Sequence, residues 1–153
     1  MWHAHRSTSR SHLAHVPFES NLSRQPLSFA VHVLPAVLYA GGLFYGGLIR
    51  MGRLPEVGFV ATDKLLHAVA FAGFALLLAR AGHWFRPARP PLTTLLGGAL
   101  GASLAGLLLE LCQACTSYRS ADAWDWVADT IGALVAVAVG FALVKLVPRR
   151  AHG

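Results

Sequence analysis

The sequence predicts an all-α integral membrane protein, a bundle of four transmembrane helices with both termini in the cytoplasm. Hydrophobic residues make up 55% of the 153 residues, whereas charged residues make up only 13%, about half the share found in soluble domains. Four long stretches carry almost no charge, and basic residues concentrate in alternate connections. This composition excludes a soluble fold with a single core.

The first hydrophobic stretch covers residues 27–49 and contains no Asp, Glu, Lys or Arg. It holds His32 and Pro35, and proline is tolerated in membrane helices where neighbouring groups satisfy the freed backbone carbonyl. The stretch is longer than the apolar core of a cleavable signal peptide, about 7 to 15 residues, and a polar segment precedes it. We therefore expect a retained membrane span.

The other three hydrophobic stretches predict spans at residues 64–81, 92–115 and 126–147. The second span is the shortest and has His67 one turn inside its start. The third span holds Glu110 near its end, and the fourth holds Asp129 near its start. A helix of about 17 to 25 apolar residues crosses the hydrocarbon core of a bilayer, so each stretch is long enough.

Polar segments flank the predicted bundle, which covers residues 27–147. Residues 1–26 contain too few apolar side chains to offset the entropy cost of ordering, so we expect a disordered cytoplasmic tail. The histidines of this tail are His3, His5, His12 and His15. No Cys or acidic ligand lies beside them, which favours solvated side chains over a metal site. Residues 148–153 are predicted to form a short basic tail.

The distribution of basic residues predicts the orientation of the bundle. Nine of the 13 Lys and Arg lie in the two tails and the second loop, against four in and beside the first and third loops. Cytoplasmic loops carry the excess of Lys and Arg in membrane proteins, so both termini should face the cytoplasm. No basic run with interleaved aromatic residues indicates nucleic-acid binding.

Small residues recur at every fourth position of the third and fourth spans, at Gly98, Ala102 and Gly106 and at Gly132, Ala136 and Gly140. Such positions share one helix face, and in lipid a stripe of small residues favours close helix packing. Trp124 and Trp126 precede the fourth span. Because Trp is enriched at the headgroup level, anchoring at the membrane interface is favoured over ligand stacking.

Polar residues gather at the predicted outer end of the bundle. Asp63 and His67 are four residues apart and share a face of the second span, while Glu110 and Gln113 are three apart near the end of the third. The second and fourth spans begin at the outer surface and the third ends there, so these groups should lie at one depth. The candidate functional residues are Asp63, Lys64, His67, Glu110, Gln113, Arg119, Asp122, Asp125 and Asp129.

These candidate residues carry more negative than positive charge. Five carboxylates face Lys64 and Arg119, which leaves a surplus of three negative charges if His67 is neutral. If these groups meet near hydrocarbon, the surplus requires shared protons, a protonated His67, a metal ion or a cationic ligand. A divalent metal is one of these alternatives, and its candidate ligands are His67, Glu110 and Asp129.

Two features beside these residues have simpler interpretations. Asp122 or Asp125 can serve as the N-cap of the fourth helix. Cys112 and Cys115 have a C-x-x-C spacing, but no thioredoxin-like βαβ pattern surrounds them. Apolar packing of the two thiols is therefore favoured over redox chemistry.

The chain resembles the VanZ-like family of small multi-pass bacterial membrane proteins. The resemblance covers residues 54–147 and lies in D-K-x-x-H at residues 63–67, E-x-x-Q at residues 110–113, and Arg119, Asp125 and Gly132 of the closing segment. Phe71 stands where the family typically has Tyr, so a phenolic donor is absent. Asp129 stands where the family usually has Asn, which adds a charge.

The resemblance implies a multi-pass protein of the bacterial inner membrane with a link to the cell envelope or to resistance against glycopeptide antibiotics such as teicoplanin. It implies no settled reaction. A polar cluster at the outer headgroup level would meet membrane lipids, lipid-linked envelope components and lipidated antibiotics, so we expect binding without turnover.

Two alternatives stay open. One is a membrane-embedded hydrolase or transferase that acts on a lipid-linked substrate, with His67 as general acid or base. No Ser-centred elbow, phosphate loop or H-E-x-x-H motif supports this alternative. The other is a purely structural membrane protein whose polar residues hold helices together.

The charge surplus also predicts how substitutions act. If Asp129 packs against Glu110, one carboxyl should hold a proton or share a cation near neutral pH. Asp129→Asn should then be tolerated or stabilising, whereas Lys64→Ala or Arg119→Ala should destabilise the protein by more.

Overall fold

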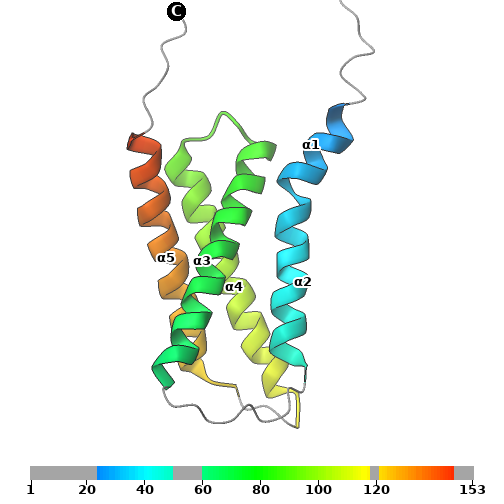
Figure 1. Cartoon of the computed structure of the whole chain (residues 1–153), viewed down its shortest axis with the longest axis vertical. Helices are drawn as coiled ribbons and strands as arrows, with labels where there is room; N and C mark the ends of the chain where they lie inside the picture. Colours follow the sequence, from blue (N-terminus) through cyan, green and yellow to red (C-terminus); the bar gives the residue numbers. More distant parts are fainter. Residues whose placement is uncertain (1–23, 50–59, 118–120, 147–153) are drawn as a thin grey trace, which may run out of the picture.

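The computed structural model describes residues 24–49, 60–117 and 121–146, and its described part consists of helices and their connections without any strand (Figure 1). The helices are α1 (Arg24–His32), α2 (Leu34–Leu48), α3 (Val60–Phe85), α4 (Pro91–Ala114) and α5 (Ala123–Leu146). The predicted all-α class is confirmed.

Within the described ranges, three helices are long and apolar enough to cross a membrane, over Thr62–Phe85, Pro91–Ala114 and Ala123–Leu146. They correspond to the predicted second, third and fourth spans. α3 extends the predicted span at residues 64–81 by about one turn at each end, whereas α4 and α5 start and end within a turn of their predicted bounds. The chain therefore has the helices of a membrane protein.

The predicted first span is divided into two helices that meet at Val33, with Pro35 in the first turn of α2. Proline lacks a backbone N–H and its ring collides with the carbonyl four residues earlier, so it favours a new helix start. The N–H groups of Ala36 and Val37 accordingly both donate to the Val33 carbonyl, at 3.0 and 3.2 Å. α2 has 15 residues, about 22 Å of helix, which is shorter than the hydrocarbon core of about 30 Å. A fourth crossing stays a prediction and requires α1 as well as α2.

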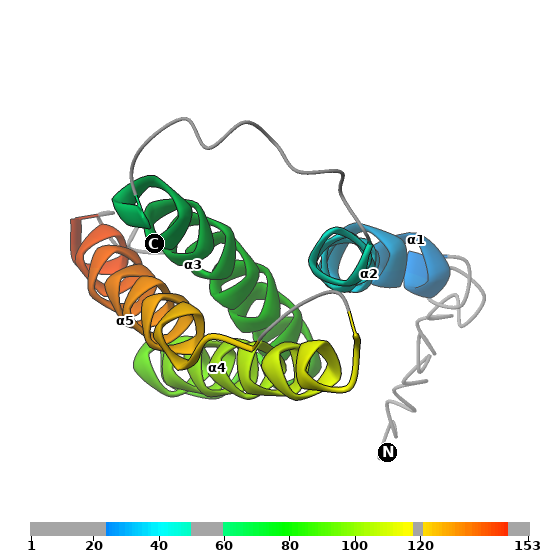
Figure 2. The same cartoon turned by 90° about the horizontal axis from the view of Figure 1, so that it is seen from below.

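α3, α4 and α5 form the core of the bundle, and each packs along the other two. α2 lies against α3 and α4 (Figure 2). The start of α1 and the end of α5 lie at the same end of the molecule (Figure 1). Two termini on one side of a membrane require this arrangement, and which side faces the cytoplasm stays a prediction. Residues 1–23 and 147–153, which include most of the predicted tails, lie outside the described residues.

Two hydrogen bonds attach the N-terminal helices to α3. The Trp84 indole Nε1 donates to Ser28 Oγ of α1 at 2.8 Å, and the Tyr39 hydroxyl of α2 donates to the Ala70 carbonyl at 3.0 Å. Apolar side chains gain little by leaving lipid for a neighbouring helix, so hydrogen bonds and close packing hold membrane helices together. α1 and α2 are therefore joined to the core at defined points.

Small residues allow the three core helices to approach closely. A Cβ atom built on Gly98 of α4 would lie 2.4 Å from the Ala75 carbonyl oxygen of α3, and one built on Gly132 of α5 would lie 1.9 Å from the Ala68 carbonyl oxygen. Ala102, on the same stripe as Gly98, is fully buried. The predicted stripes of small residues are thus the packing surfaces of α4 and α5.

Gly98→Ala and Gly132→Ala should each destabilise the protein, because the added methyl group would meet backbone atoms of α3 that no side-chain rotation can move. Overpacking of this kind costs about 1–3 kcal/mol or more. Gly97 lies beside Gly98 and has no atom within 4 Å of its Cβ position, so Gly97→Ala is the matched control. It should be neutral or slightly stabilising, since Ala favours a helix over Gly by about 1 kcal/mol. Equal melting temperatures of Gly98→Ala and Gly97→Ala in detergent would contradict this packing.

Candidate functional site

The predicted polar residues meet at the end of the bundle where α3 and α5 begin and α4 ends (Figure 1). The polar cluster comprises Asp63, Lys64 and His67 of α3, Glu110 and Gln113 of α4, and Asp122, Asp125 and Asp129 at or in the first turns of α5. The antiparallel order of the three helices brings these residues to one depth. Arg119 lies outside the described residues.

His67 and Asp129 form the most deeply buried pair of the polar cluster. His67 Nδ1 lies 2.9 Å from Asp129 Oδ1, and Asp129 is 0% exposed. The pair joins α3 to α5 one turn from Gly132, where the absence of a side chain lets α5 approach Ala68. A carboxylate that accepts the Nδ1 proton fixes the tautomer of an imidazole. The Nε2 atom of His67 is therefore left for other partners.

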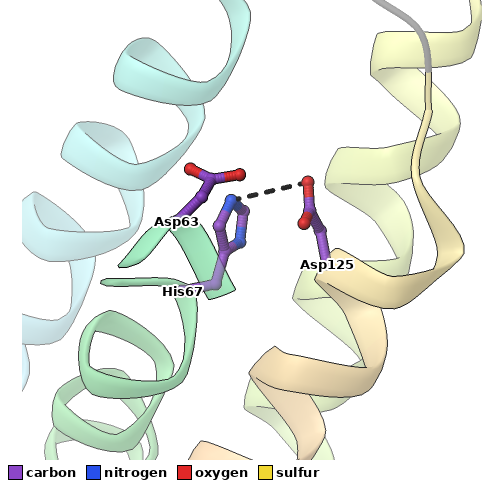
Figure 3. Close-up of side chains that lie close together, drawn as sticks. All are labelled: Asp63, His67 and Asp125. Carbon is purple, nitrogen blue, oxygen red and sulfur yellow. Dashed lines mark ion pairs between the residues drawn. The ribbon is translucent and has the colours of Figure 1, made fainter. Parts of the chain in front are cut away.

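The Nε2 atom of His67 faces two further carboxylates (Figure 3). It lies 3.7 Å from Asp125 Oδ2, while Asp63 lies one turn before His67 on α3. One ligand atom from each of these three side chains lies within 4.8 Å of the others. Sequence reasoning named Glu110 and Asp129, beside His67, as candidate ligands if a metal binds. The structure instead groups His67 with Asp63 and Asp125, because Asp129 takes the opposite imidazole nitrogen.

Lys64 lies between two carboxylates at the start of α5. Its Nζ atom is 2.5 Å from Asp122 Oδ2 and also forms an ion pair with Asp125. The hydrogen bond from Lys64 lowers the pKa of Asp122, and the backbone N–H of Trp124, which donates to Asp122 Oδ1 at 2.9 Å, lowers it further. The contact with Trp124 makes Asp122 the N-cap of α5, one of the two roles considered for it.

The two residues of the E-x-x-Q pattern hold neighbouring segments of chain. Glu110 Oε2 accepts a hydrogen bond from the Asp122 backbone N–H at 2.8 Å, and Gln113 Nε2 donates to the Gly47 carbonyl near the end of α2 at 3.1 Å. The spacing of three residues thus lets α4 hold the start of α5 and the end of α2 at once. Glu110 and Asp129 therefore form hydrogen bonds with different partners, the Asp122 backbone and His67.

Two buried carboxylate oxygens of the polar cluster, Glu110 Oε1 and Asp129 Oδ2, have no hydrogen-bond partner among the residues that the structure describes. Asp129 Oδ2 lies against α4, since a Cβ atom at Gly106 would be 2.6 Å from it. The described residues of the cluster include five carboxylates but a single ammonium group, that of Lys64. Burying carboxylates without compensating positive charge costs free energy. This end of the bundle therefore favours the binding of a proton or a cation.

A cavity of about 270 Å³ lies beside the polar cluster, between α2, α3 and α4. Its lining includes the apolar residues Leu43, Leu66, Phe71 and Leu109 and the polar residues Asp63, His67 and Gln113. Phe71 gives the wall an apolar ring at the position where the resemblance noted in the sequence implies a Tyr.

Sequence reasoning missed the contribution of α2 to this cavity. Gly42 and Gly46 line it, and neither has an atom within 4 Å of its Cβ position. The glycines on one side of α2 were the available signal, because a helix face without side chains leaves space beside its neighbours.

The side chains of the Trp and Cys residues singled out in the sequence take no part in the ion pairs of the polar cluster. Trp124 is 70% exposed, as expected for an interface residue, whereas the indole Nε1 of Trp126 donates to the Ser103 carbonyl of α4 at 3.1 Å. Cys112 and Cys115 are free thiols. Cys115 is exposed, so the expected apolar packing does not hold for it.

The VanZ/LLP1 family model matches residues 2–145, nearly the whole chain. The protein belongs to the VanZ/LLP1 family. Comparisons with curated proteins and with solved structures gave no match. The matched range includes every residue of the polar cluster, so this cluster belongs to a VanZ-like membrane protein.

Lys64→Ala should lower the melting temperature in detergent, because it leaves Asp122 and Asp125 without their cation. The Lys64 side chain is 23% exposed, so the loss should lie between the ~1 kcal/mol of an exposed pair and the ~3–5 kcal/mol of a buried one. Lys145→Ala is the matched control. Lys145 is exposed near the opposite end of the bundle, over the Phe141 ring, and its loss should change the melting temperature little.

Asp129→Asn should be tolerated or stabilising, since the amide oxygen can accept the same hydrogen bond from His67 while a buried charge is removed. Melting curves of the wild type, Asp129→Asn and Lys64→Ala between pH 5 and pH 9 test both expectations. If Asp129→Asn were the least stable of the three at neutral pH, the stability of the protein would have to depend on the negative charge of Asp129.

Proposed function

We propose that this VanZ-like protein binds a lipid-linked envelope component or a lipidated glycopeptide such as teicoplanin at the outer surface of a bacterial cytoplasmic membrane, without turning it over. The observation that carries the proposal is the position of a mainly apolar cavity directly beside the polar cluster. An amphiphile with an apolar chain and a polar head matches both parts.

The cavity favours an apolar chain as one part of the ligand. Ligand pockets commonly have volumes of about 300–1,000 Å³, so about 270 Å³ suits one acyl chain or part of it better than a whole glycopeptide. Asp63, His67 and Gln113 line the same cavity and can orient the polar head. The rest of a large ligand would lie in the headgroup region.

The charge of the polar cluster favours a cationic group on the ligand. The described residues of the cluster hold five carboxylates and one ammonium group, that of Lys64, and this excess of negative charge would repel a bare phosphate or carboxylate group. A ligand with an amine or guanidinium group beside its acyl chain therefore fits better than an anionic lipid alone. An anionic head would need a metal ion between it and the carboxylates.

The charges at the other end of the bundle support one orientation in the membrane. Arg80, Arg86, Arg89 and Lys145 all lie toward the end away from the polar cluster, and basic residues favour the cytoplasmic side. The polar cluster would then face outward, where envelope ligands and antibiotics arrive.

Native Cys115 gives a direct test of this orientation. It is exposed at the end of α4 that carries the polar cluster, so a membrane-impermeant thiol reagent should label it in intact cells expressing Cys112→Ser. A cysteine placed at Arg86 in a Cys112→Ser/Cys115→Ser background should react only after the cells are opened. The reverse pattern of labelling would invert the orientation.

Growth inhibition tests the ligand. Expressed in a sensitive bacterial host, the wild type should raise the inhibitory concentration of teicoplanin several-fold over the empty vector, and that of vancomycin by less. Asp63→Asn should reduce this rise in inhibitory concentration by altering the polar part of the cavity lining. Gly46→Leu should reduce it by filling the cavity, whereas Gly97→Leu adds the same side chain at an open position outside the cavity and should not.

Membrane levels of each variant, measured by immunoblot, show whether a lost effect reflects lost protein. Identical inhibition of the wild type, the variants and the empty vector would remove the resistance function. A retained effect in Gly46→Leu would exclude the cavity as the site of the acyl chain.

A second candidate function rests on the His67–Asp129 pair. A buried carboxylate that orients an imidazole is suited to general acid–base chemistry, for example in a hydrolase of lipid pyrophosphates. One water would cleave the pyrophosphate: its oxygen forms a bond to one phosphorus while the bond from that phosphorus to the bridging oxygen breaks, and one of its two protons passes to His67 Nε2 and then to the bridging oxygen of the leaving phosphate. Phosphate release by the purified protein that disappears in His67→Gln would favour this function over binding alone.

A further inference from the structure

We propose that Asp63, His67 and Asp125 form a binding site for one divalent transition-metal ion such as Zn²⁺ or Mn²⁺. The proposal goes beyond the ligand-binding function and does not depend on it. It rests on the geometry of the three side chains, on a fourth residue that orients the imidazole, and on the charge around them.

The donor atoms come from two helices that pack closely. Asp63 and His67 lie one turn apart on α3, and Asp125 faces them from the first turn of α5 (Figure 3). Their candidate ligand atoms lie within 4.8 Å of one another. Ligands about 2.0–2.2 Å from a common ion lie at most about 4.4 Å apart. Small side-chain rotations would therefore suffice to bring all three onto one ion.

Asp129 supplies the outer partner that a metal-binding histidine needs. Metal-ligating His residues almost always donate their other ring N–H to a carboxylate, a carbonyl or water, which fixes the tautomer. His67 Nδ1 meets the fully buried Asp129 Oδ1 at 2.9 Å, so the lone pair of Nε2 is directed toward the two candidate carboxylates.

The surrounding charges favour a divalent cation. Lys64 pairs with Asp122 Oδ2 and with Asp125 Oδ1, which leaves Asp125 Oδ2 directed at His67. Glu110 and Asp129 are 5% and 0% exposed, and within the described part of the chain each has one oxygen without a hydrogen-bond partner. A single ammonium group among the described residues of the cluster does not compensate five carboxylates. A divalent ion held by Asp63, His67 and Asp125 would add two positive charges to this cluster.

The site is also accessible. Asp63 is exposed, and Asp63 and His67 both line the cavity between α2, α3 and α4. Three protein ligands leave at least one coordination position open for water or for a ligand group. One imidazole nitrogen with two carboxylate oxygens suits Zn²⁺ or Mn²⁺ rather than a soft ion such as Cu⁺.

Zinc binding to the full-length chain tests the proposal. The protein is purified without a histidine tag and carries alanine at His3, His5, His12 and His15, so that the N-terminal histidines cannot contribute. Calorimetric titration should give one Zn²⁺ per chain, and Zn²⁺ should raise the melting temperature. Asp63→Asn and His67→Gln should each weaken the affinity at least about tenfold. His83→Gln, at the far end of α3, is the matched control and should bind as the parent does.

Because Asp63 is exposed, Asp63→Asn should fold even if His67→Gln does not. The absence of stoichiometric Zn²⁺ and Mn²⁺ binding would overturn the proposal and leave His67 as an imidazolium between Asp125 and Asp129. Zinc affinity unchanged in Asp63→Asn would also overturn it. Cobalt gives a second readout: the visible spectrum of the Co²⁺-loaded parent should be lost in both ligand variants and kept in His83→Gln.

Discussion

The hydrogen bond between His67 and the buried carboxylate of Asp129 is the interaction on which the arrangement of this bundle depends. It crosses the interface of α3 and α5, and it forms only because these helices approach closely at Gly132. Gly106 leaves room for the same carboxylate against α4. Small residues and a buried polar pair therefore act together: the glycines permit the contact, and the contact fixes the depth and direction of the imidazole.

The polar cluster divides into residues that hold helix ends and residues that face a cavity. Lys64 and Glu110 secure the start of α5 through Asp122, and Gln113 holds the end of α2. Asp63 and His67 instead line the cavity. The helix contacts account for the spacing of the E-x-x-Q pattern without a catalytic role, so a purely structural function explains that pattern. A purely structural function does not explain Asp63, so substitutions of the polar residues that line the cavity are the most informative.

Hydropathy predicted the three core helices because hydrocarbon requires long uncharged segments, and the antiparallel order of the helices predicted the shared depth of Asp63, Glu110 and Asp129. The sequence did not predict which carboxylate binds His67, since that choice depends on helix rotation and on rotamers. The break at Val33 was missed because proline can be accommodated within a membrane helix as well as begin a new one. The cavity depends on glycines of α2 that leave space, a feature that hydropathy does not detect.

Nitrogen-15 NMR of histidine-labelled protein tests the central pair most directly, with the resonances of His67 assigned by their absence in His67→Gln. If the Asp129 carboxylate accepts the hydrogen bond, Nδ1 of His67 must carry a proton at neutral pH, and its resonance must change in a full-length Asp129→Leu variant. A protonated Nδ1 that responds to this substitution is the predicted result. A neutral imidazole with its proton on Nε2 and a bare Nδ1 would contradict the account, because His67 could not then donate to Asp129.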